Sequence, residues 1–321
     1  MRVITSPVPP ASLARADREP RTPLRIGLVQ HAWDPDPAVL EERLSEGIGA
    51  AAGQGARAVF LPELTLSRYP AFERAGAEPG RAAEELTDGP TYAFASRAAK
   101  EHGVLVHASL YERADAADGL GFNTAILVGP DGELLGRTRK LHIPVSPGYY
   151  EDTYFRAGPA EDAYPVYRPG ALDGVALGLP TCWDEWFPEV SRCYSLAGAE
   201  LLVYPTAIGS EPTFPRFDTQ PLWRKVIVAN GITAGTFMVV PNRTGDEGGL
   251  RFYGSSFISD PYGRVLVEAP REQEAVLVAD LDLDARKDWL DLFPFLTTRR
   301  PDTYAALTEP VAPGAPYGGE A

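Results

Sequence analysis

One cysteine stands where an α/β protein would place a nucleophile. Cys182 follows the apolar stretch 175–179 and precedes a polar turn that leads into a helix predicted to start near Trp186. A thiol at such a strand-to-helix corner lies near a helix N-terminus, where the dipole favours the thiolate. The position suits nucleophilic chemistry, although a buried cysteine beside a strand is more often inert packing.

An acid and an amine occupy comparable positions elsewhere in the chain. Glu63 ends a short apolar strand predicted at 58–61, and Lys140 lies where a basic run leaves a predicted hairpin strand. Open α/β sheets bind ligands at the carboxyl ends of their strands, so these two side chains and Cys182 could converge. Glu63 and Lys140 alone are also compatible with a structural ion pair.

Together the three groups could attack an amide or nitrile carbon. Cys182 would form an acyl-enzyme, and Glu63 would act first as base and then as acid. Lys140 and the backbone N–H of Trp183 would stabilise the oxyanion, and Lys140 would also favour the thiolate.

Composition and charge exclude several kinds of partner. The chain has 321 residues with a formal net charge of -14, which argues against nucleic acid. No apolar run is long enough to predict a membrane span, and the four histidines lack the spacing of a metal site. The two cysteines fit a reducing cytoplasm, and Cys193 falls inside a predicted helix, which disfavours a disulfide with Cys182.

The predicted elements alternate in a way that indicates a layered α/β domain. Strands are expected at 24–30, 58–61, 104–111, 201–206 and 237–242, and helices from Asp36–Pro37, at 90–102 and at about 222–233. Hairpins at 125–135 and 256–266 have similar turns and indicate a weak internal repeat. We expect a disordered leader at 1–23, one domain at 24–304 and an extended tail at 305–321.

Three separated motifs carry a resemblance to a known family. They are Leu-Pro-Glu-Leu around Glu63, Arg-Lys-Leu-His-Ile-Pro around Lys140 and Cys-Trp-Asp-Glu-Trp-Phe-Pro-Glu from Cys182. The chain resembles the nitrilase, or carbon–nitrogen hydrolase, superfamily over most of residues 24–304. Further segments are similar to its N-carbamoylputrescine amidase branch: 147–151, 204–212, 252–257 and 299–302.

The resemblance implies a fold, an activity and one more site residue. It implies a four-layer α-β-β-α sandwich, hydrolysis of a non-peptide C–N bond in a small molecule, no cofactor, and helix-mediated pairing into a homodimer or higher homo-oligomer. Glu151 matches the position of a second glutamate that orients Lys140 or the attacking water. Two positions depart from the branch: Glu185 stands where glutamine is common, and Asn230 where histidine is frequent.

The substrate pocket is predicted from acidic and aromatic residues near these motifs. The candidate binding residues are His142, Tyr149, Trp183, Asp184, Glu185, Trp186 and Glu211. The acids could attract the ammonium end of a carbamoyl-diamine, and the aromatic rings, Tyr150 among them, could pack against its methylenes. Alternatively, the two tryptophans belong to the core and Glu211 caps a loop.

The sequence therefore predicts a cysteine-dependent hydrolase that converts an N-carbamoyl amine into amine, carbon dioxide and ammonia. An amidase, a nitrilase or an amide-forming acyltransferase acting on another small metabolite would use the same three residues. A non-catalytic binding protein that retains the fold is the alternative from another class.

Overall fold

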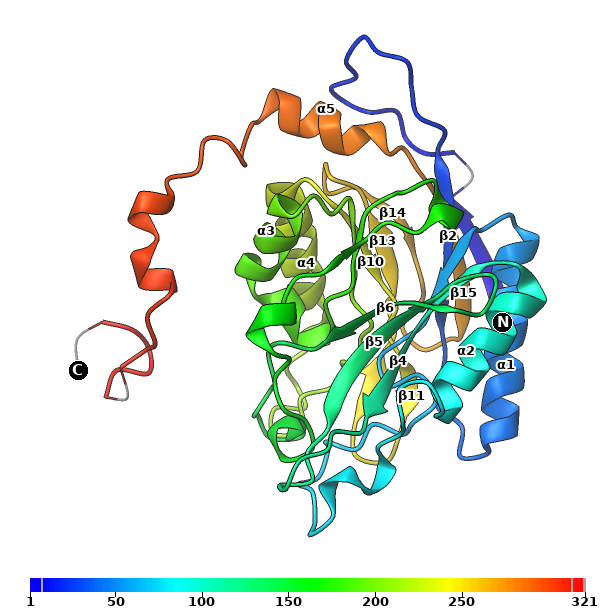
Figure 1. Ribbon diagram of the computed structural model, residues 1–321, viewed down its shortest axis with the longest axis vertical. Coiled ribbons are helices and arrows are strands. Elements are labelled where there is room, and N and C mark those ends of the chain that lie inside the picture. The colour runs from blue at the N-terminus through cyan, green and yellow to red at the C-terminus, as the bar shows by residue number, and fades with distance from the viewer. Residues whose placement is uncertain (7, 313, 320–321) are drawn as a thin grey trace.

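Two β-sheets lie face to face between two pairs of helices in the computed structural model, which describes residues 1–6, 8–312 and 314–319 (Figure 1). The seven-stranded sheet has the order β1 (Arg2–Ser6), β15 (Ala275–Leu281), β2 (Leu24–Gln30), β3 (Ala58–Phe60), β4 (Leu105–Glu112), β5 (Phe122–Val128) and β6 (Leu134–Arg139). The six-stranded sheet has the order β14 (Val265–Glu268), β13 (Phe257–Ser259), β10 (Phe237–Val240), β9 (Leu201–Val203), β8 (Leu177–Gly178) and β7 (Val166–Tyr167).

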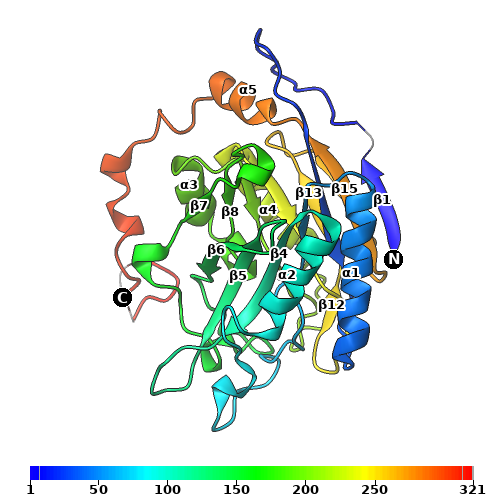
Figure 2. The ribbon, with the colours of Figure 1, turned by 45° about the vertical axis from the view of Figure 1, so that its right-hand side comes forward.

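The helices cover the outer faces of these sheets. Helices α1 (Pro37–Gly53) and α2 (Pro90–His102) pack on the larger sheet, and α3 (Pro188–Leu196) and α4 (Gln220–Ala234) pack on the smaller one (Figure 2). The predicted four-layer α-β-β-α sandwich is thus confirmed. A small separate hairpin is formed by β11 (Thr244–Asp246) and β12 (Arg251–Tyr253). Helix α5 (Asp284–Leu292) is the last α-helix in the described residues.

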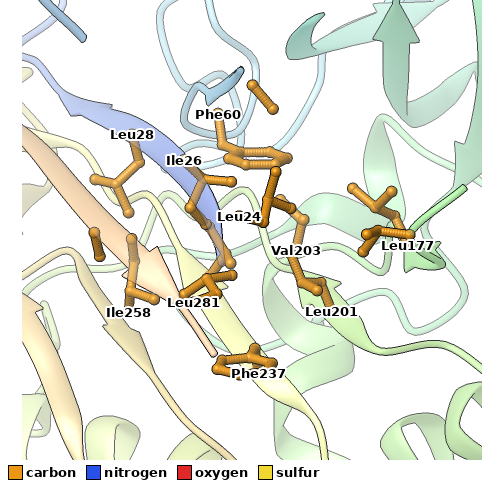
Figure 3. Close-up of a cluster of buried hydrophobic side chains, with 14 of the residues drawn as sticks. Leu24, Ile26, Leu28, Phe60, Leu177, Leu201, Val203, Phe237, Ile258 and Leu281 are labelled. Atoms are coloured by element: carbon orange, nitrogen blue, oxygen red, sulfur yellow. The ribbon is translucent and has the colours of Figure 1, made fainter. Parts of the chain in front are cut away.

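The main core lies between the two sheets. Leu24, Ile26 and Leu28 alternate along β2 toward the smaller sheet, where Leu201 and Val203 of β9 meet them (Figure 3). The next residue, Val29, instead packs toward the helices outside the larger sheet. The central strands are therefore apolar on both faces, as expected for strands covered by two layers.

Several predicted boundaries agree closely with the structure. The Asp36 side chain caps α1 by accepting from the Ala38 N–H at 2.9 Å, and α2 ends at Gly103 with a left-handed φ of 65°. The two predicted hairpins are β5–β6 and β13–β14, and each follows a parallel pair, β3–β4 or β9–β10, in the same sheet. This correspondence agrees with the weak internal repeat.

The expectation of a disordered leader is wrong for the part of 1–23 that the structure describes. Strand β1 pairs in parallel with β15, with Arg2 opposite Ala275 and Ser6 opposite Ala279. Farther along, the Ser12 hydroxyl lies 2.7 Å from the Tyr262 hydroxyl. Arginines at 15, 18 and 21 then pair with acids that include those of α5. This part of the chain is ordered because β1 pairs with the edge of β15, and because the arginines that follow form ion pairs with acidic side chains.

The chain leaves the body of the molecule after α5. Residues beyond it run alongside the sandwich as an arm with two short 3₁₀ turns, Pro301–Thr303 and Ala305–Leu307 (Figure 1). The described residues 305–312 and 314–319 belong to this arm. No helix in the described part of the chain is long and apolar enough to cross a bilayer.

Candidate active site

Four buried groups meet where strands of both sheets end. Glu63 follows β3, Lys140 follows β6, Cys182 follows β8, and Glu151 begins a short 3₁₀ turn, η2 (Glu151–Thr153). Glu63, Lys140 and Glu151 are at most 1% exposed, and Cys182 is 6% exposed. The structure therefore brings the three predicted motifs, and the glutamate implied by the resemblance, to one place.

The Lys140 ammonium lies between two carboxylates. Its Nζ donates to Glu63 Oε1 at 2.9 Å and to both oxygens of Glu151 at 2.9 and 2.7 Å. Burial disfavours the charge, but the Glu151 and Glu63 carboxylates outweigh it and raise the pKa of Lys140 well above its ordinary value. Lys140 is therefore a fixed positive charge in a site shielded from water.

The two oxygens of Glu63 have different surroundings. Oε1 accepts from Lys140 and from the Asn123 side-chain amide at 2.7 Å. Oε2 is buried and has no hydrogen-bond partner among the described residues. An unpartnered buried carboxylate oxygen is costly, and a substrate or a proton donor would satisfy it. This oxygen is the one available to a reacting group.

Cys182 opens a 3₁₀ turn, η5 (Cys182–Trp186), with a left-handed φ of 40°. Its backbone N–H donates to the Pro205 carbonyl at 3.0 Å, which fixes the nucleophile corner against the end of β9. Burial and the nearby Glu63 raise the pKa of the Cys182 thiol well above its ordinary value, although Lys140 acts in the opposite direction.

The expected effect of a helix dipole, which favours the Cys182 thiolate, is outweighed by burial, which raises the pKa of the thiol. The element after Cys182 is a five-residue 3₁₀ turn rather than a long helix, so its dipole is small. Burial disfavours any unpaired anion, and two carboxylates already occupy the site. Burial therefore favours the neutral thiol, whose attack on a substrate would need a base. Both Cys182 and Cys193 are free thiols in the structure.

Glu151 is held from two sides. Besides Lys140, its Oε1 accepts from the Tyr69 hydroxyl at 2.8 Å. Burial raises the pKa of Glu151 to about 7, against the opposing effect of Lys140. Tyr69 was not predicted from the sequence, because a tyrosine beside the first motif cannot be assigned a role until its partner, Glu151, is known.

A buried arginine supports the loop that carries Glu63. Arg243 follows β10; its Nε donates to the Glu63 carbonyl at 3.1 Å, and its Nη atoms reach the Leu64 and Ser67 carbonyls. Its Nη1 also pairs with the buried Glu247 carboxylate at 2.6 Å. Sequence analysis missed this residue because its role depends on a contact across about 180 positions.

A cavity of about 240 Å³ opens in front of Cys182. Its wall includes the predicted binding residues Tyr149, Trp183, Trp186 and Glu211, together with Glu151. Glu63 and Lys140 are not part of this wall; they lie behind it. Glu211 accepts from the Thr219 hydroxyl at 3.3 Å and forms no ion pair within the described residues.

The other predicted binding residues lie outside the cavity. Asp184 is buried and accepts from the Thr181 and His142 N–H groups at 3.0 and 2.9 Å. The His142 ring contacts Asp184 at 2.7 Å and stacks on Phe187. Glu185 is buried against α4, where it accepts from Trp223 Nε1 at 2.5 Å.

The geometry of η5 explains this outcome. In a 3₁₀ turn, residues three apart share a face, so Trp183 and Trp186 both line the cavity. Asp184 and Glu185 do not line the cavity; their buried carboxylates accept hydrogen bonds that organise the turn. We therefore correct the expectation that Asp184, Glu185 and His142 contact substrate.

The chain belongs to the carbon–nitrogen hydrolase family, whose model matches residues 25–290. An N-carbamoylputrescine amidase from Arabidopsis thaliana is 37% identical over 80% of this chain and 86% of its own length. A citrullinase from Francisella tularensis is 30% identical over 88% of this chain and 96% of its own. This protein is accordingly a hydrolase of C–N bonds.

Solved structures agree with this assignment. A carbon–nitrogen hydrolase from Helicobacter pylori G27 has a TM-score of 0.80 at 30% identity, covering 90% of this chain and 99% of that one. An amidase from Nesterenkonia sp. AN1, in complex with acrylamide, has a TM-score of 0.72 at 26% identity, with the same coverage. Both support the four-layer fold.

Replacing Arg243 by methionine should destabilise the protein by about 3–5 kcal/mol, because it leaves the buried Glu247 carboxylate unpaired and the loop carbonyls without a donor. Urea unfolding measures this free energy. As a control, Arg251→Met removes an exposed arginine and should change stability by less than about 0.5 kcal/mol. Equal stabilities of Arg243→Met and Arg251→Met would contradict the role of Arg243.

Proposed function

We propose that this protein hydrolyses an N-carbamoyl amine with Cys182 as nucleophile. The observation that carries the proposal is a buried Glu63–Lys140–Glu151 cluster behind Cys182, joined to a small cavity with an unpaired carboxylate in its wall. Two relatives are named for N-carbamoylputrescine and for citrulline, and both of these molecules carry a ureido group. That common group favours ureido hydrolysis over nitrile hydrolysis.

In the first step, the unpartnered Oε2 of Glu63 takes the proton of the Cys182 thiol as sulfur attacks the ureido carbon. The neutral resting thiol makes this proton transfer necessary. Negative charge then develops on the former carbonyl oxygen. The Lys140 ammonium and the Trp183 backbone N–H would stabilise it.

The tetrahedral intermediate collapses when the C–N bond to the terminal nitrogen breaks. Glu63 returns its proton to that nitrogen, ammonia leaves, and an N-substituted thiocarbamate remains on Cys182. Water, deprotonated by Glu63, attacks this thioester-like carbon and releases the thiol and a carbamic acid. The carbamic acid decomposes to carbon dioxide and the free amine.

Glu151 acts through Lys140 in this scheme. Its two hydrogen bonds to Nζ hold the ammonium in one position, and Tyr69 holds Glu151 in turn. Because Glu151 also lines the cavity, it could orient the attacking water. It is proposed as a positioning residue.

The cavity suits a short aliphatic chain that ends in a cation. Trp183, Trp186 and Tyr149 offer apolar and aromatic surface, and Glu211 offers a carboxylate without a cationic partner in the described residues. Ammonium groups bind favourably to such an arrangement of aromatic faces and one acid. The substrate class proposed is thus a carbamoylated diamine.

Cys182→Ala should lower steady-state ammonia release by about 10⁴-fold or more, and Glu63→Gln should lower it by about 10²–10⁴-fold with no initial burst of ammonia. Cys193→Ala changes the other thiol, on α3, and should keep wild-type activity. Turnover by Cys182→Ala, or an ammonia burst from Glu63→Gln, would contradict the mechanism.

Glu211→Gln should raise KM for N-carbamoylputrescine by about 10–100-fold, since a charge-assisted contact is lost, while N-butylurea, which lacks the amine, should be hydrolysed as by wild type. Glu272→Gln removes an exposed acid outside this cavity and serves as control. Equal losses on both substrates would argue against ammonium binding. Faster turnover of simple amides or nitriles than of either urea would favour the amidase or nitrilase alternatives.

We also infer that copies of the chain associate. The end of α5 and the arm after it expose apolar side chains: Leu292, Phe293, Leu307 and Val311 are between 45% and 64% exposed. A solvated arm of this kind would gain by packing on a second copy. Sedimentation velocity should show a dimer or larger species, and a monomer at micromolar concentration would overturn the inference.

A further inference from the structure

Glu185 is a buried acid that neither the cavity nor an ion pair accounts for. It lies on η5, three residues after Cys182, and is 1% exposed. No lysine, arginine or histidine pairs with it within the described residues. An isolated carboxylate in such a place would cost several kcal/mol, so the surroundings must favour another state of the group.

The hydrogen bonds are compatible with a neutral carboxylic acid. Trp223 Nε1, on α4, donates to Glu185 Oε1 at 2.5 Å, and Glu185 Oε2 lies 3.4 Å from the Thr206 hydroxyl oxygen. A threonine hydroxyl has one proton, and that of Thr206 also lies 2.9 Å from the Tyr204 carbonyl, which can only accept. If Thr206 donates to Tyr204, the contact with Glu185 is a hydrogen bond only when Glu185 supplies the proton.

The surrounding charges favour the same protonation state. Burial raises the pKa of Glu185 well above its ordinary value; Glu63 adds to this effect, while Trp223, Lys140 and Thr206 oppose it. The other titratable groups that sense Glu185 are Cys182 on the same turn, Tyr204 after β9 and Tyr253 on β12. From α4 the neighbours are uncharged, Trp223 and Asn230.

Glu185 also anchors the turn that carries the nucleophile. Its side chain contacts Trp223 of α4 and Thr206 beyond β9, and its backbone carbonyl accepts from Asn230 Nδ2 at 2.8 Å. These contacts tie the C-terminal part of η5 to the helix layer, while the Cys182 N–H ties its start to Pro205. Glu185 and Cys182 therefore belong to one short turn that is held at both ends.

We propose that Glu185 is a positioning residue held as the neutral carboxylic acid, and that its ionisation would loosen the turn that carries Cys182. The charge of an ionised Glu185 would further oppose formation of the Cys182 thiolate. A neutral acid has the shape and the donor–acceptor pair of a glutamine side chain. The link to catalysis rests on the proposed function, but the protonation state can be tested without it.

The first test is stability as a function of pH in wild type and Glu185→Gln. A carboxyl whose folded-state pKa is raised binds more protons in the folded than in the unfolded protein, so wild type should lose stability relative to the variant as pH rises from about 5. The ratio of their unfolding constants should change by up to about tenfold per pH unit until the folded-state acid ionises.

Glu189→Gln makes the same chemical change at an exposed position on α3 and should follow wild type at every pH. A ratio between wild type and Glu185→Gln that is independent of pH would overturn the proposal.

The second test is the pH profile of kcat. Glu185→Gln should have kcat and KM within about twofold of wild type near neutral pH and should retain kcat at alkaline pH where wild type loses it, because glutamine cannot ionise. A kcat loss of more than about 100-fold in Glu185→Gln near neutral pH would show that the charge is needed, and would overturn the proposal.

Infrared spectroscopy keeps the proposal testable if Glu185→Gln does not fold. Wild type should show the C=O band of a protonated carboxylic acid at neutral pH, and Trp223→Phe should shift that band to higher frequency because the carbonyl loses its N–H donor. If no carboxylic acid band of the wild-type spectrum shifts in Trp223→Phe, the neutral state of Glu185 is excluded. Neither spectrum nor stability requires an active enzyme.

Discussion

The arrangement of the active site depends on one buried ammonium held by two carboxylates. Lys140 alone in this interior would be driven to its neutral form, and Glu63 and Glu151 alone would repel each other. Together they largely offset one another's charge in a buried region. Such a cluster is costly to assemble, and removing Lys140 would leave two buried carboxylates without their cationic partner. The surrounding polar contacts are therefore concentrated on these groups.

The two-sheet sandwich supplies the stiffness that this cluster requires. Glu63, Lys140 and Cys182 each follow a strand whose neighbours are packed on both faces, so their backbones cannot relax independently. Arg243 reinforces the first of these loops from across the sandwich through its hydrogen bonds to backbone carbonyls. A fixed Lys140 then costs no reorganisation when an oxyanion forms beside it.

Much of this arrangement could be predicted from sequence because its signals are local. Apolar strands, the Asp36 cap and the Gly103 stop are short-range features, and three reactive residues stood directly after predicted strands. Two kinds of feature could not be predicted from the sequence. Strands β1 and β15 pair ends of the chain more than 260 residues apart, a contact that no local pattern encodes.

The directions of side chains in η5 are the second kind. The motif around Cys182 identifies which residues are close to the nucleophile, but only the structure shows that Trp183 lines the cavity while the carboxylates of Asp184 and Glu185 are buried in hydrogen bonds to other groups. An acid near a nucleophile in sequence is thus weak evidence for contact with substrate, whereas an acid in the cavity wall, such as Glu211, is stronger evidence.

A neutral resting thiol also fits the design of the site better than a preformed thiolate. A thiolate at Cys182 would add a third anion to a buried cluster with only one cation, and it would be open to oxidation and to any electrophile that enters the cavity. Deprotonation during attack avoids both the third buried anion and the exposure of a reactive thiolate. The proton moves to Glu63 as the negative charge passes from sulfur to the substrate oxygen. The net charge of the site together with its substrate then stays constant along the reaction, and Lys140 is matched to the point where charge appears. The low reactivity of the resting thiol follows from the same burial that makes Lys140 effective in the transition state.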